Sequence, residues 1–231
     1  MKRVAIVQSN YIPWKGYFDL INRVDEFILY DDMQYTRRDW RNRNKIKTPD
    51  GTAWLTIPVE VKGKYLQKIN ETRINDKNWC RKHWQTLVAY YSKASCFKLY
   101  KDLFEELYLT CNEEYLSRIN YRFILAINEI LGITTSIRWS GEFTLSEGKT
   151  EKIIGICKDT NAGIYLSGPA AKEYFDEEIA ERENIKVEWM DYSGYPAYSQ
   201  LYPPFTHNVT VLDLIFNQGP DSKKYMKSFG I

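Results

Sequence analysis

The chain has 231 residues, of which 44% are hydrophobic and 27% are charged, and its formal net charge is +2. These values are ordinary for a globular domain, so they exclude a disordered chain, and the small net charge argues against nucleic-acid binding over the whole surface. The four cysteines lack CxxC spacing and no segment reaches about 18 apolar residues, so we expect a soluble, cytoplasmic protein without membrane insertion, disulfides or a zinc site.

Short apolar runs predict the strands of the first third of the chain. The runs at 4–8 (VAIVQ), 26–30 (EFILY) and 53–59 (AWLTIPV) have the length of buried strands. Between the first two, a proline turn at 10–16 precedes helical spacing over 17–23. Residues 76–131 then show three successive stretches of helical spacing that end at Gly132, a typical C-cap residue. We therefore predict an inserted helical segment at about 76–131.

Strands and helices alternate again in the last third. Residues 136–140, 164–168 and 186–192 are strand-like, whereas 150–159 and 170–183 have helical spacing. This alternation predicts an α/β fold, with a Rossmann-like, mostly parallel sheet and helices on both faces, and we expect residues 1–231 to form one domain. Ligands bind beyond the carboxyl ends of such strands. The polar groups that follow the predicted strands are 8–10, 31–32, 140–142, 167–168 and Asp191.

The most informative segment is 31–47, DDMQYTRRDWRNRNKIK. It places two carboxylates, Asp31 and Asp32, before a cluster of donors made by Arg38, Arg41, Asn42, Arg43 and Lys45. Planar donors at the end of a strand favour a phosphate or carboxylate site, and the interleaved rings and amides are typical of a pocket. The alternative stays open that this is a solvated face whose arginines pair with nearby acids.

Two strand–turn–helix segments add candidate binding residues. The first, at 8–16, offers Gln8, Asn10, Tyr11, Trp14 and Lys15 around a helix N-terminus that suits phosphate. The second, YLSGPAAKEYF at 165–175, offers Ser167 and Gly168 before a proline at the first helical position. Each segment is also compatible with a turn or cap that binds nothing.

The chain has only two histidines. His207 stands before Asn208, the predicted N-cap of a helix, and it is the leading general-base candidate beside Asp32. A capping or hydrogen-bonded role for His207 stays open, and His83 is expected to be structural. No metal-ligand spacing, GxSxG, GxGxxG or Walker motif occurs, so we predict no protein metal site, although Asp31 and Asp32 could hold magnesium through phosphate.

The chain resembles the WbqC-like family in five ordered segments: QSNYIPWKGYFDLI, YDDMQYTRRDWRNRNKIK, WLTIPV, YLSGPAAKEY and WMDYSGYPAYSQ…PFTHNVTVLDLIFNQGP. The first segment is also similar to the opening of nucleotidylyltransferases, in which a strand leads through a proline turn into HxGH and a helix. Here the matching stretch keeps Gly16 but lacks both histidines, which puts histidine-assisted adenylyl transfer in doubt while leaving a shared fold possible.

The resemblance implies an enzyme of surface polysaccharide (O-antigen) biosynthesis that acylates, with a glycyl-like group, the amine of a nucleotide-linked amino sugar. In this hypothesis Arg38, Arg41, Arg43 and Lys45 bind the phosphates, Trp14 and Tyr11 stack on the base or sugar, and Asp32 or His207 takes the amine proton. The donor stays open among an acyl-adenylate, a thioester and aminoacyl-tRNA, with ATP and Mg²⁺ as candidate cofactors. The alternatives are an ATP-dependent nucleotidyltransferase and a non-catalytic binding or scaffold protein.

Overall fold

A five-stranded, all-parallel sheet forms the centre of the fold. The computed structural model describes residues 1–230. The sheet contains β1 (Arg3–Val7), β2 (Glu26–Leu29), β5 (Ser136–Trp139), β6 (Ile164–Ser167) and β7 (Lys186–Trp189), in the order β5-β2-β1-β6-β7. Each of these strands matches a predicted one, and the α/β, Rossmann-like fold is therefore confirmed.

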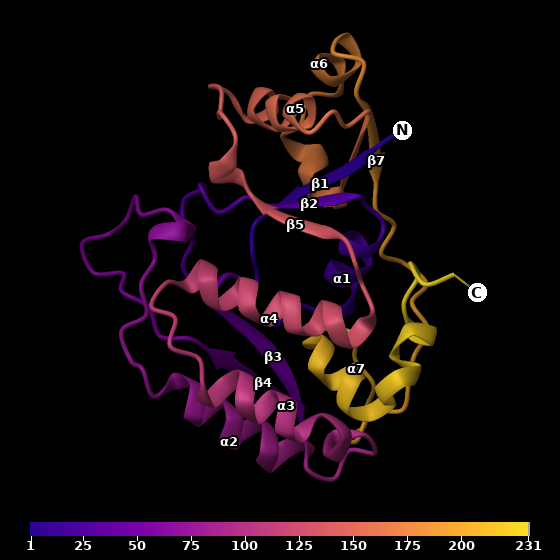
Figure 1. Cartoon of the computed structure of the whole chain (residues 1–231). Coiled ribbons are helices and arrows are strands. Elements are labelled where there is room, and N and C mark those ends of the chain that lie inside the picture. The colour runs from indigo at the N-terminus through magenta and orange to yellow at the C-terminus, as the bar shows by residue number, and fades with distance from the viewer. Residues whose placement is uncertain (231) are drawn as a thin grey trace.

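Helices cover both faces of this sheet (Figure 1). On one face lie α5 (Lys149–Asp159) and α6 (Glu177–Arg182); on the other lie α1 (Lys15–Asn22) and α4 (Leu116–Leu131). The strands alternate accordingly, because successive side chains point to opposite faces. In β1, Ala5 packs into the core on the α1 side, and Val4 and Ile6 pack into the core beneath α5.

The β3–β4 hairpin and the remaining helices form the lower half of the molecule in Figure 1. This half contains β3 (Arg43–Thr48), β4 (Gly51–Thr56), α2 (Trp79–Tyr91), α3 (Phe97–Leu109) and α7 (Val211–Gln218). The short helical turns of the chain are η1 (Ile69–Glu71), η2 (Ser140–Glu142), η3 (Pro169–Glu173) and η4 (Gly219–Tyr225). Within residues 1–230, none of the helices combines the length and apolar character needed to cross a bilayer.

Three local predictions are corrected. The run at 53–59 lies outside the parallel sheet, because β4 pairs antiparallel with β3. The helix predicted over 170–183 is broken into η3 and α6, since the Asp176 side chain accepts hydrogen bonds from two backbone amides and starts a new helix. Thr210, rather than Asn208, caps α7. Gly132 does adopt the left-handed C-cap conformation, with φ 65°.

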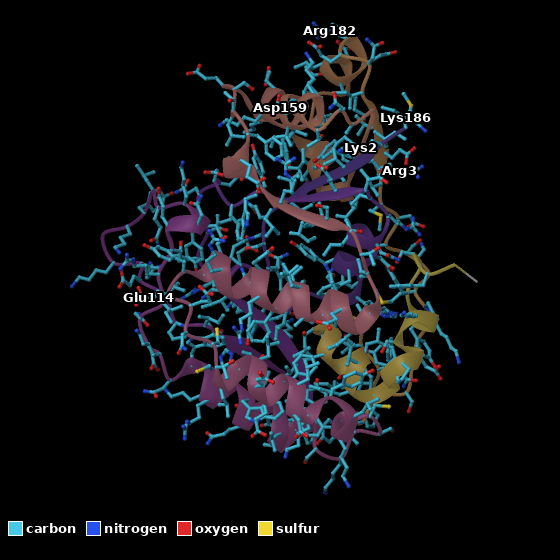
Figure 2. The ribbon with its side chains drawn as sticks, viewed as in Figure 1. Lys2, Arg3, Glu114, Asp159, Arg182 and Lys186 are labelled. Atoms are coloured by element: carbon cyan, nitrogen blue, oxygen red, sulfur yellow. The ribbon has the colours of Figure 1, made fainter. Side chains whose placement is uncertain are left out.

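Charged side chains surround this fold at its periphery. Figure 2 labels Asp159, Arg182 and Lys186 near α5, α6 and β7, and Glu114 at the left edge of the molecule. All four are exposed. Buried carboxylates are instead paired: Asp19 of α1 accepts hydrogen bonds from the backbone amides of Lys227 and Ser228, both at 2.9 Å.

His83 of α2 is buried between the hairpin and the helices. Its Nε2 lies 3.2 Å from the carbonyl oxygen of Thr56, and its Nδ1 lies 2.9 Å from the hydroxyl of Tyr11. Because a carbonyl only accepts, Nε2 carries the proton, and the Tyr11 hydroxyl donates to Nδ1. Burial lowers the pKa of His83 to about 4. The predicted structural role of this histidine agrees with these contacts.

We expect His83 to make the fold acid-sensitive. An unfolded histidine binds a proton below about pH 6.5, whereas folded His83 does so only near pH 4. Neutral His83 therefore contributes fully to the free energy of unfolding above pH 6.5. This contribution, roughly 3 kcal/mol, is lost as the pH falls from 6.5 to 4. Urea unfolding at pH 7 and pH 4.5 should show a smaller acid loss for His83→Gln than for His207→Gln. Equal losses in both variants would contradict this assignment.

Candidate functional site

A cavity of about 510 Å³ lies at the point where the strand order reverses. From β1 the chain moves outward through β2 and β5, and it then returns to the other side of β1 to form β6 and β7. The crevice between the carboxyl ends of β1 and β6 is therefore uncovered, which is where open α/β sheets bind ligands. Gln8 and Asn10 line it beyond β1, and Ser167 and Gly168 line it beyond β6.

The lining of this switch-point cavity combines positive charge with aromatic rings. Arg41, Lys149 and Lys152 supply the cations. The rings are those of Trp14, Tyr17, Tyr30, Tyr174 and Tyr192. Cations suit phosphate or carboxylate groups, and flat rings suit a base or a sugar, so the lining suits a ligand that has both parts.

Arg41 is the member of the basic segment that reaches this cavity. Its side chain is only 12% exposed and lies 3.4 Å from Asp39. Its Nε is buried and has no hydrogen-bond partner within residues 1–230. Unpaired donors of this kind are rare in folded proteins and point to a missing ligand or water.

The two carboxylates after β2 have structural partners. Asp31 is buried and accepts hydrogen bonds from the backbone amide of Ser9 and from the Ser117 hydroxyl. Burial raises its pKa, although these bonds and the nearby Arg41 charge oppose the rise. Asp32 accepts from Ser140 Oγ at 2.6 Å and from Asn70 Nδ2 at 3.1 Å. These contacts tie the ends of β1, β2 and β5 together.

A second cavity, of about 260 Å³, adjoins the first. It is lined by Asn10, Pro13, Trp14, Trp40, Asn44, Asn208 and Val209. Asn10 and Trp14 line both cavities and therefore form the wall between them. The Asn10 Oδ1 atom is buried and, within the described residues, accepts no hydrogen bond. An acceptor at this boundary is suited to bind an N–H or O–H group of a ligand.

His207 lines neither cavity, but it is next in sequence to Asn208, which lines the second one. Its ring contacts Phe205 edge-on, with 4.5 Å between centroids, and its buried Nδ1 has no partner within residues 1–230. Burial and the positive charge of Lys15 lower the pKa of His207. The imidazole is therefore neutral at pH 7, the state in which it accepts a proton.

The Lys15 side chain itself is buried. Its Nζ donates to the Pro196 carbonyl at 3.2 Å and lies 4.8 Å from the ring centroid of Tyr195. Burial lowers the pKa of Lys15 to about 8, and Asp19 opposes that shift. Lys15 lines neither cavity, so its charge acts on the site through His207 rather than by direct contact with a ligand.

The structure brings together part of the predicted set. The switch-point cavity is lined by Gln8, Asn10, Trp14, Arg41, Ser167 and Gly168. The others line neither cavity, namely Tyr11, Lys15, Asp32, Arg38, Asn42, Arg43, Lys45 and His207. Tyr11 is buried against His83 and Tyr108, and the Asn42 amide donates to the Ile57 carbonyl.

Sequence reasoning missed several lining residues. They are Tyr17, Tyr30, Lys149, Lys152, Tyr174 and Tyr192 around the first cavity. Trp40 and Asn44, which line the second cavity, belong to the rings and amides of the basic segment that predicted a pocket. Lys149 and Lys152 had a usable signal, because they stand three apart in the first turn of the helix that precedes β6. The tyrosines had none, since 18 are spread along the chain.

Comparison with known proteins places the chain in a family. A family model described as the WbqC-like protein family matches residues 8–225. The chain belongs to the WbqC-like protein family. This WbqC-like protein is 49% identical over 227 residues to uncharacterized protein Rv1507c of Mycobacterium tuberculosis, and the match covers 98% of each chain. No solved structure matches it significantly.

Gly16 holds the wall residue Trp14 of this WbqC-like protein in place. A Cβ atom at Gly16 would lie 2.3 Å from Trp14 Cζ2, so Gly16→Ala must displace the indole. We expect this variant to unfold at a lower temperature and to change the tryptophan fluorescence. The control is Gly155→Ala in α5, where the nearest atom would lie 3.8 Å away. That control should gain up to about 1 kcal/mol from helix propensity. Similar melting shifts in both would contradict the packing role of Gly16.

Proposed function

We propose that this protein is a transferase of surface polysaccharide biosynthesis that acylates the amine of a nucleotide-linked amino sugar. The observation that carries the proposal is the switch-point cavity, which combines three cations with a wall of aromatic rings. A nucleotide-linked sugar has a diphosphate for the cations and two rings for the aromatic wall. Membership of the WbqC-like family supports the polysaccharide context.

Each part of the acceptor has a partner in the proposed complex. Arg41, Lys149 and Lys152 bind the diphosphate, and Trp14 stacks on the base or the sugar. The Asn10 Oδ1 atom, which lacks a partner within residues 1–230, accepts a hydrogen bond from the sugar amine. This bond holds the amine at the boundary of the two cavities, where it faces a donor in the second one.

The reaction forms an amide bond by attack of the neutral amine nitrogen on the acyl carbonyl carbon. The bond from that carbon to its carrier breaks, and the amine loses one proton. Of the two predicted bases, His207 is favoured. It is neutral at pH 7, its Nδ1 has no partner in the described chain, and its sequence neighbour Asn208 lines the second cavity. Asp32 is already bound by Ser140 and Asn70. The proton then passes from His207 to the leaving carrier.

ATP-dependent nucleotidyl transfer is the second candidate, and the Rossmann-like strand order with α1 directly after a proline turn favours it. Magnesium-bound ATP fits the residues less well. Within residues 1–230 no three His, Cys, Asp or Glu side chains converge, and Asp31 and Asp32 are both hydrogen-bonded elsewhere. Pyrophosphate release from ATP without a sugar acceptor would favour this candidate over acyl transfer. Tight binding without turnover would favour a scaffold.

Arg41→Ala should weaken binding of UDP, the simplest nucleotide diphosphate probe, by about 10- to 100-fold, because charge-assisted hydrogen bonds to phosphate are lost. The fold should persist, since the Asp39 partner of Arg41 is partly exposed and the buried Asp31 keeps its hydrogen bonds from Ser9 and Ser117. Calorimetric titration measures the affinity. Arg81→Ala is the control, because Arg81 is an exposed arginine that lines neither cavity. Equal UDP affinities of the two variants would remove Arg41 from the site.

His207→Ala should lower the turnover of amine acylation by about 10²- to 10⁴-fold, as expected for loss of a general base. A base must be neutral to act, and the lowered pKa of His207 puts the acid limb of the wild-type pH–rate profile below pH 6.5. The variant should lose this limb, and added imidazole should restore part of the rate. If the pH–rate profile of the variant keeps the acid limb and added imidazole does not raise its rate, another group takes the proton.

A further inference from the structure

Two tryptophans form an exposed pair at the edge of the second cavity. Trp40 precedes β3 and Trp54 lies in β4, and their ring centroids are 5.4 Å apart with the planes inclined at 42°. Trp40 is 43% exposed and Trp54 is 41% exposed. Exposed indole faces are uncommon in soluble proteins unless they serve a binding role. Trp40 also lines the second cavity, so the pair leads directly into it.

Two cationic side chains lie over Trp54, and two more precede Trp40 in the sequence. The Arg43 guanidinium lies 4.1 Å from the centroid of the Trp54 ring, and Lys45 Nζ lies 5.0 Å from it. Arg37 and Arg38 are exposed on the same segment. Among the described residues 1–230, none of these four cations lies within ion-pair distance of a carboxylate. Because Arg43 and Lys45 lie over the Trp54 ring, positive charge is available beside the exposed ring of Trp40.

Indole faces with free arginine and lysine side chains bind bases by stacking and phosphates by charge. We propose that this surface, Trp40 and Trp54 with Arg37, Arg38, Arg43 and Lys45, binds an adenosine nucleotide that carries the acyl group. The inference rests on the proposed acyl transfer. Acyl-adenylates, coenzyme A thioesters and aminoacyl-tRNA all carry adenosine and phosphate, so one surface suits the chemistry that they share.

The position of the surface fits the direction of transfer. Adenine stacks on Trp40, and the acyl group enters the second cavity past Asn44. The sugar amine lies on the other side of Asn10 and Trp14, in the switch-point cavity. When the new C–N bond forms, the C–O or C–S bond to the carrier breaks, and the carrier leaves as an alcohol, phosphate or thiol with the proton that His207 took. No oxidant or other reactant is needed.

The test measures binding of three probes in the absence of any sugar: coenzyme A, a short RNA hairpin that ends in single-stranded CCA, and AMP. We expect at least one to bind, and Trp40→Ala to weaken it about 10-fold or more, because a stacked base is lost. Trp189→Ala is the control, since Trp189 of β7 also has a cation over its ring, Lys172 at 5.4 Å, but lines neither cavity. Lys45→Ala should lower the salt dependence of binding by about one phosphate contact.

Each outcome decides the proposal. Binding of coenzyme A that depends on Trp40 supports it with a thioester as donor. Binding of the RNA that depends on both Trp40 and the terminal adenosine supports it with tRNA as donor. AMP is titrated as the probe for an acyl-adenylate donor, and binding of AMP alone that depends on Trp40 supports the proposal with that donor. Failure of coenzyme A, the RNA and AMP to bind at millimolar concentration, or equal affinities for Trp40→Ala and Trp189→Ala, overturns it.

The same variants separate this inference from the proposed acyl transfer. Arg41→Ala should leave the affinity for coenzyme A and RNA unchanged, and Trp40→Ala should leave the affinity for UDP unchanged. If UDP binding ignores Arg41 while probe binding needs Trp40, the acceptor site is wrong and the nucleotide surface stands. If UDP binding needs Arg41 while binding of coenzyme A and RNA does not need Trp40, the nucleotide surface is wrong and the acceptor site stands.

Discussion

The buried carboxylate of Asp31 organises the site. Ser9, at the end of β1, donates its backbone amide to one oxygen at 2.8 Å, and Ser117 of α4 donates its hydroxyl to the other. Asn120, one turn further along α4, donates to Ser9 Oγ and to the Arg41 carbonyl, both at 2.9 Å. A buried charge is tolerated only when it is paired and hydrogen-bonded, so this carboxylate fixes three segments at once. The side chain of Arg41 reaches the cavity because its backbone is held by this network.

The same network joins the two halves of the molecule. The parallel sheet supplies the ends of β1 and β2, α4 packs on its face, and the basic segment leads into the hairpin of the other half. Asn44 in β3 extends the connection, because its side chain donates to the carbonyls of Tyr11 and Ile12 at 3.2 and 2.9 Å. The turn between β1 and α1 is thus held by Asp31 at the end of β2 and by Asn44 of the hairpin. This rigidity suits a site whose walls come from many separate segments.

The sequence predicted the sheet well and the hairpin poorly, for a physical reason. The three central strands of the sheet, β2, β1 and β6, are mostly apolar runs, such as VAIV in β1, because both of their faces are covered. The inward residues at β3 are Asn42, directly before the strand, and Asn44 and Ile46 within it; the two amides bond to backbone carbonyls. Hydrophobic periodicity cannot reveal a strand whose inward face is polar, so it predicts no strand over 43–48.

The alternation in β3 also explains which basic residues reach the cavity. Arg43 and Lys45 point outward over Trp54, away from the inward amides, whereas Arg41 precedes the strand and turns toward the sheet. The roles of Asp32 and His207 stay predictions, since proton transfer depends on a ligand position that no pattern of residues specifies.

The wall shared by the two cavities has a thermodynamic consequence. Trp14 rests on Gly16 on one side and contacts Tyr192 on the other, at 5.2 Å between ring centroids. A ligand that displaces this indole from one cavity alters the volume and lining of the other. The two occupants are then coupled, and linkage requires that each changes the affinity of the other by the same factor. A single side chain can in this way set the order in which two substrates are taken up.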